Sequence, residues 1–176
     1  MKKIVWVVIA VTIVVAGFML YPRGSDEQQI RNIIKAGAQA IEEKQLGDTL
    51  KHVSRKYKDK RGLSYLAIRT IMIRLFAHYS EIDINYSINK LEITGDRATA
   101  DLSLTVVIVK DGKPAYLLGK ASKPGALTLL LKKSGLDWEV IEVKNLELST
   151  ITDLVYFDYE APYTMARKDS LLNTGL

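Results

Sequence analysis

The spacing of apolar residues changes twice along the chain, and each change marks a different kind of element. Residues 4–21 contain no charged side chain at all. From Ser25 onward, apolar residues recur at steps of three and four, which indicates helices. From Glu81 they alternate with polar residues, which indicates strands. The pattern therefore predicts one long apolar helix, then amphipathic helices, then strands.

Three helices are predicted before the strands. The first covers residues 25–44, because the Ser25 hydroxyl can accept from the backbone N–H of Gln28 and the Gln28 side chain can reach back, as in a capping box. The second covers about 46–54. The third covers about 64–79 and is apolar around most of its circumference, so we expect it to be substantially buried.

Five strands in an antiparallel meander are predicted at residues 81–94, 97–108, 114–121, 126–133 and 138–148. In the first, the alternation slips by one residue at Asn89-Lys90, as a β-bulge would produce, and bulges bend long strands. Gly95-Asp96 and Asp111-Gly112 mark tight turns. Helices followed by antiparallel strands predict an α+β fold: three helices packed on a curved sheet, preceded by one transmembrane helix.

The uncharged run 4–21 is long enough to span a bilayer, since its 18 helical residues cover roughly 27 Å of the ~30 Å hydrocarbon core. It is longer than the apolar part of a signal peptide and ends in bulky residues, so we expect a retained anchor; cleavage or a merely buried helix are the alternatives. Lys2 and Lys3 predict a cytoplasmic N-terminus. The chain then reads as a single-pass inner-membrane protein whose domain is periplasmic or extracytoplasmic.

Composition agrees with one tethered domain. The chain of 176 residues divides into an anchor at 1–24, an α+β domain at 25–149 and a C-terminal tail at 150–176. Because there is no cysteine, the core must be stabilised without disulfides. The tail sets four aromatic residues among carboxylates before turning polar, so we expect its first half to dock and its end to be disordered.

Positive charge is concentrated in one short segment, residues 51–61. It holds six cations against Asp59 alone, +5 in all, which equals the net charge of the whole chain. Such a patch fits an anionic membrane surface or an acidic partner, and a solvated loop is the alternative. Nucleic acid is disfavoured by the predicted compartment. The cations of this basic patch are Lys51, Arg55, Lys56, Lys58, Lys60 and Arg61.

The order of elements over residues 26–148 resembles the nuclear transport factor 2-like superfamily. Gly135, Trp138 and Val140 match a Gly-x-x-Trp-x-hydrophobic pattern in the last hairpin of that family, and the early Gly95-Asp96 hairpin also fits. The resemblance implies a cone in which a curved sheet wraps the helices around an internal pocket. The family includes isomerases, dehydratases and polyketide cyclases, and also members that only bind or assemble.

Candidate chemistry is sparse. His78 and Asp83 are the weak candidates for an acid/base pair, although Asp83 alternates with the apolar face and should point away from the helices. Tyr57, Tyr86 and Tyr116 are the weak candidates for a ligand pocket. The two histidines have no metal-ligand spacing, so no metal and no cofactor are predicted.

The leading hypothesis is a membrane-anchored, non-catalytic binding or assembly domain. Its expected partners are the bilayer, through residues 4–21, and a protein partner or a second copy of the chain. The alternative is an isomerase- or cyclase-like enzyme that uses the cone pocket, and a third hypothesis is a membrane-surface module acting through the basic patch. Outward-facing His78 and Asp83 would count against the enzyme.

Overall fold

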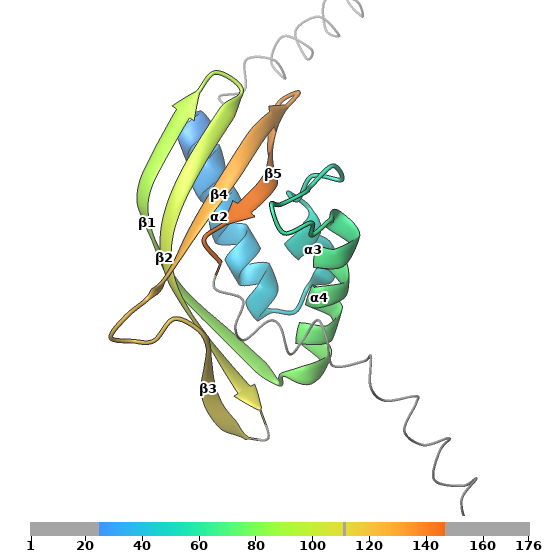
Figure 1. Cartoon of the computed structure of the whole chain (residues 1–176), viewed down its shortest axis with the longest axis vertical. Coiled ribbons are helices and arrows are strands. Elements are labelled where there is room, and N and C mark those ends of the chain that lie inside the picture. Colours follow the sequence, from blue (N-terminus) through green and yellow to red (C-terminus); the bar gives the residue numbers. More distant parts are fainter. Residues whose placement is uncertain (1–24, 111, 147–176) are drawn as a thin grey trace, which may run out of the picture.

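The computed structural model describes residues 25–110 and 112–146, which form one antiparallel sheet curved around three helices (Figure 1). This confirms the predicted α+β class. Within this part of the chain, no helix is long and apolar enough to cross a membrane. The predicted span at 4–21 and the tail at 150–176 lie outside the described residues.

The elements are α2 (Asp26–Glu42), α3 (Leu46–Leu50), α4 (Tyr65–His78), β1 (Glu81–Thr94), β2 (Arg97–Lys110), β3 (Lys113–Leu118), β4 (Gly125–Ser134) and β5 (Asp137–Lys144).

Strand β2 is the centre of the sheet. It pairs with β1 along one edge, and its other edge is shared by β4, opposite residues 97–104, and β3, opposite residues 106–110. The chain passes from β3 to β4 through Gly119, whose φ is +64°. A Cβ there would lie 2.5 Å from the backbone nitrogen of Gly125 and 2.8 Å from the carbonyl oxygen of Leu104, so only glycine fits. Figure 1 shows β3 at the lower end of the sheet, apart from the upper parts of β1 and β4.

Three register shifts interrupt the strand pairing of the sheet. The predicted slip in β1 is confirmed, because the register shifts between Ile88 and Lys90 and leaves Asn89 unpaired. The Asn89 amide instead donates to the Ser103 hydroxyl at 2.7 Å. Two further register shifts, which the sequence pattern did not predict, place Leu117 outside the pairing of β2 with β3 and Ile141 outside the pairing of β4 with β5. Bulges of this kind increase local twist and bend the bulged strand.

The helices differ from the predictions at their ends. The Ser25 hydroxyl accepts from the backbone N–H of Gln28 at 3.3 Å, as predicted, but the Gln28 side chain donates to Asn32 rather than completing a capping box. Helix α3 ends at Leu50, not near residue 54. The reason is that the next residues pair with the free edge of β5: Val140 N–H donates to the His52 carbonyl at 2.7 Å.

The prediction for α4 is correct only for one face. Ile71 and Leu75 are buried against the sheet, whereas Leu66 is 69% and Ile73 40% exposed. A helix that is apolar around its circumference need not be enclosed, because here the sheet covers one side alone (Figure 1). Leu66 and Ile73 therefore face away from the cone, on the side of α4 that also carries the exposed Arg69 and Thr70.

Candidate functional site: an apolar cavity in the cone

A cavity of about 320 Å³ lies between the helices and the inner face of the sheet. Alternation along β2 turns Leu102, Leu104 and Val106 toward the helices. Helix α2 faces them with Gly37, and a Cβ built on Gly37 meets no atom within 4 Å. The space therefore exists partly because α2 places no side chain here. Aliphatic side chains make up most of the wall, among them Ile33, Ile34, Ile41, Ile68, Ile71, Leu75, Leu127, Leu129, Val140 and Val143.

Most polar groups reach the cavity from one side, the segment that begins with α3, and Tyr86 on β1 is the exception. The polar groups of that segment are Asp48, Thr49, His52, Tyr57 and Arg61. Tyr57 is 4% exposed, and its hydroxyl oxygen accepts from the backbone N–H of Val143 at 3.2 Å. Burial, and next the charge of nearby Asp59, raise the pKa of Tyr57, so the phenol stays neutral at physiological pH. The cavity is thus apolar with one polar side.

A buried carboxylate fixes the loop on that side. Asp59 is 5% exposed, and one of its oxygens accepts from the backbone N–H groups of Arg61 and Leu63, both at 2.9 Å. The other oxygen accepts from the Arg61 guanidinium at 2.9 and 3.0 Å. Arg61 also donates to the carbonyl of Leu146 at 2.9 Å. This arrangement ties the loop to the end of the described chain and neutralises the charge of Arg61.

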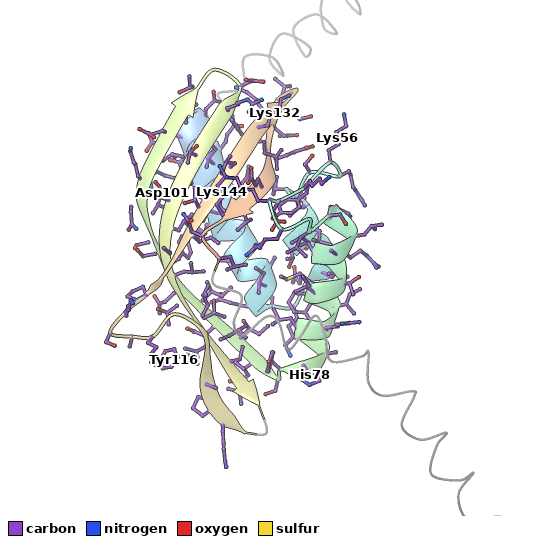
Figure 2. All side chains as sticks on the ribbon, in the orientation of Figure 1. Lys56, His78, Asp101, Tyr116, Lys132 and Lys144 are labelled. Atoms are coloured by element: carbon purple, nitrogen blue, oxygen red, sulfur yellow. The ribbon has the colours of Figure 1, made fainter. Side chains whose placement is uncertain are left out.

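The candidates from the sequence separate into two groups. Tyr57 and Tyr86 line the cavity. Tyr116 does not line it and is 48% exposed on β3. His78 and Asp83 are exposed and do not line it either; Asp83 faces away from the helices, as the alternation predicted. Figure 2 labels His78 at the lower end of α4 and Tyr116 beside β3.

The six residues of the basic patch occupy three environments. Arg61 pairs with Asp59 beside the cavity. Arg55 lies with its guanidinium carbon 4.3 Å from the ring centroid of Tyr65, a cation–π geometry. The remaining four, Lys51, Lys56, Lys58 and Lys60, are exposed.

Two polar residues of the cavity, Asp48 on α3 and His52 just beyond the end of α3, were not predicted as site residues. Asp48 and His52 are four residues apart and both line the cavity. That spacing was available as a signal, since residues four apart share one helix face. Within the described ranges no group of three His, Cys, Asp or Glu side chains could hold a metal ion.

The cone of helices and bent sheet around an apolar interior is the nuclear transport factor 2-like fold. Solved structures with this fold include a putative scytalone dehydratase from Novosphingobium aromaticivorans, which is 7% identical over 67% of this chain and 80% of that chain, with a TM-score of 0.57. A nuclear transport factor 2-like superfamily protein from Salmonella enterica is 13% identical over 66% of this chain and 86% of that chain, with a TM-score of 0.54.

A third structure, Bd1075 from Bdellovibrio bacteriovorus, is 17% identical over 69% of this chain, with a TM-score of 0.54. This chain spans 40% of the length of Bd1075. At such identities the likeness defines the fold alone. No protein-family model and no curated protein matches the sequence.

Proposed function

We propose that the chain is a non-catalytic binding domain, held at a membrane by residues 4–21, whose cone cavity takes a small apolar ligand. The observation that carries the proposal is the cavity itself. Its volume of about 320 Å³ is at the lower end of the range for ligand sites, and its wall is largely aliphatic. Transfer of an apolar molecule from water into such a space is favourable, at roughly 25 cal/mol for each Å² of apolar surface removed from water.

The distribution of polar groups defines the ligand further. Asp48, His52 and the neutral Tyr57 reach the cavity from the same segment, while α2 and the sheet supply apolar wall. A molecule with an apolar body and one hydrogen-bonding end matches this arrangement. The earlier candidates His78 and Asp83 lie outside, so neither can touch a molecule in the cavity.

The membrane part of the proposal depends on the sequence. Residues 4–21 carry no charge, and α2 begins at Asp26, only a few residues beyond them. The domain is then held close to the membrane on its periplasmic or extracytoplasmic side, with Lys2 and Lys3 in the cytoplasm. A reporter fused after Leu176 that is active only outside the cytoplasm supports this orientation, and one active only inside it rejects the orientation.

Filling the cavity tests ligand binding. Gly37→Leu extends a side chain into the empty space, and Gly47→Leu, on α3, is the matched control because Gly47 also has no atom near its Cβ and does not line the cavity. Native mass spectrometry of the full chain released from micelles should show a bound small molecule in the parent and in Gly47→Leu, and none in Gly37→Leu. Adducts present equally in all three proteins would reject the cavity as the site.

A second candidate function rests on Asp48 and His52, a carboxylate and an imidazole that both line the cavity. Such a pair can move a proton to and from a bound molecule, as an isomerase- or cyclase-like enzyme requires. One structure of the same fold is described as a putative scytalone dehydratase. If the bound molecule is converted during incubation, and Asp48→Asn abolishes the conversion, the enzyme replaces the binding domain. Recovery of the molecule unchanged supports binding alone.

A further inference from the structure

A second hollow lies on the outer side of the helices, separate from the cone cavity. It is a groove of about 440 Å³ between α3, α4 and the start of β5. Three cations line it, each from a different element: Lys51 caps the end of α3, Arg55 follows in the loop, and Arg69 lies on α4. Leu50 and the ring of Tyr65 form part of its floor, and both are buried.

The three cations of the groove have no ion-pair partner among the described residues. Ion pairs are formed elsewhere in the described ranges, for example by Arg31 with Glu27 and by Lys133 with Asp26. The groove contains a single carboxylate, that of Glu139, against its three cations. It therefore attracts a negatively charged partner.

The environment of Arg55 narrows the kind of partner. Leu50 and Tyr65 are already buried in the domain, at 6% and 8% exposed, so the open surface of the groove is mainly that of its cations. A peptide that combines carboxylates with aromatic side chains could meet these cations and also stack on Arg55. Arg55 already lies against one aromatic ring, at 4.3 Å from its centroid, which leaves the other face of its planar group available for stacking.

This chain carries such a peptide in its own tail. Between Lys144 and Arg167 there is no lysine or arginine. The aromatic residues of that stretch are Tyr156, Phe157, Tyr159 and Tyr163, and its carboxylates are Glu147, Asp153, Asp158 and Glu160. Charge and side-chain type are both complementary to the groove.

The position of the last described residues makes the contact reachable. The carbonyl of Leu146 accepts from Arg61, and Leu146 lines the cone cavity together with Leu50 and Val53. Leu50 and Val53 also line the groove, so the cavity that Leu146 lines shares part of its wall with the groove. Residue 156 follows ten positions later, and ten extended residues span up to about 33 Å.

We propose that the groove between α3 and α4 binds residues 153–163 of the same chain, with Asp158 and Glu160 at its cations and an aromatic side chain against the open face of Arg55. The groove and the cone cavity share Leu50 and Val53. Docking of this acidic-aromatic segment therefore steadies the side of the domain from which polar groups reach the cavity.

The absence of cysteine from the chain allows a direct test in the full-length protein in lipid nanodiscs. Gly47→Cys places a thiol in the groove without removing a charge, and Ala161→Cys places one in the segment. The control pairs Ala161→Cys with Ala115→Cys, an exposed site on β3. We expect a disulfide within one chain to form at least about tenfold faster at the groove than at the control site. Equal rates, or disulfides only between two copies of the chain, would overturn the proposal.

Exchanging the charges of the groove and the segment is the second part of the disulfide test. Arg55→Glu with Arg69→Glu should slow the groove disulfide about tenfold, and adding Asp158→Lys with Glu160→Lys should restore the rate. Rescue by the exchanged charges distinguishes pairing from damage to the fold. Lys113→Glu with Lys123→Glu, on the β3 side, is the matched control and should leave the rate unchanged. A rate insensitive to the first pair, or not restored by the second, would reject the pairing.

Discussion

The end of the cone around Trp138 and the cavity beside it are built from the same strands, yet one is filled and the other is hollow. Trp138 and Ala100 are both 0% exposed, and Leu131 is 1% exposed. The small side chains of Ala98 and Ala100 on β2 leave room that the indole fills. Further along β2, Leu102 and Leu104 face Gly37, and about 320 Å³ stays open. Side-chain volume, matched at one end and mismatched at the other, separates the two regions.

Helix α2 belongs to both regions and shows how they depend on each other. Its first half buries Ile30 completely in the Trp138 cluster, and its second half carries Gly37 over the cavity. An open apolar space forfeits packing contacts, which costs stability. The filled end offsets that cost and holds the helix in place. The comparison predicts that substitutions at the filled end lower stability strongly, and that filling the hollow end raises it.

Trp138→Ala should have the largest effect. It removes the most deeply buried large side chain, along with the hydrogen bond that its indole N–H donates to Asp26 at 3.1 Å. We expect the free energy of unfolding to fall by about 3–5 kcal/mol, measured by urea denaturation. Leu136→Ala, at a residue of the adjoining turn that is 61% exposed, is the control and should change it by less than about 0.5 kcal/mol. Similar losses in both variants would contradict a filled end.

Asp59→Ala should cause the second-largest loss of stability, because it acts on the polar side of the cavity and not on the packed core. The substitution leaves the backbone N–H groups of Arg61 and Leu63 without their acceptor. Loss of hydrogen bonds to a buried charged group predicts a decrease of about 2–3 kcal/mol, and faster amide hydrogen exchange in the loop. Asp96→Ala, in an exposed turn, serves as control and should change neither quantity. Unchanged exchange at Leu63 would show that Asp59 does not hold the loop.

Gly37→Ala should raise stability, in contrast to both. Helix interiors favour alanine over glycine by about 1 kcal/mol, and the new methyl group meets no atom within 4 Å. Gly119→Ala is the opposite control, since its backbone has a positive φ and its Cβ would meet backbone atoms. We expect thermal unfolding to shift upward for the first and downward for the second. A decrease for Gly37→Ala would mean that the space beside α2 is not open.

Local patterns in the sequence predicted much of this fold. Alternation placed the β1 bulge at Asn89, because a change of phase is visible in consecutive residues. Helix α3 was predicted too long because its end depends on a distant partner: Val53 bridges to Val140 on the edge of β5. No pattern within residues 46–54 contains that information.

The cavity was harder to predict than the strands. The face of each strand follows from alternation, so Asp83 was correctly expected to point outward. An empty volume instead depends on how side chains from several distant elements add up, and Gly37 matters only because of what lies opposite. The three tyrosine candidates illustrate the limit, since Tyr57 and Tyr86 line the cavity and Tyr116 lies on the outer side of β3.

The smallest expected effect concerns the contact at the filled end between Asp26, the first residue of α2, and the β4–β5 hairpin. Hydrogen bonds from Lys133, at 2.6 Å, and from Trp138 hold the pKa of Asp26 below its usual value of 3.8. A lowered pKa in the folded state stabilises the fold above the pKa of the unfolded chain, and this contribution is lost as the pH falls through the folded value. Asp26→Asn should therefore be slightly less stable than the parent at pH 7, and the difference should shrink as the pH falls through the lowered pKa of Asp26, measured by urea denaturation across the acid range. Asp96→Asn should match the parent throughout. A difference that persists unchanged in acid would mean that Asp26 acts through packing and not through its charge, so that the filled end would depend on Trp138 alone.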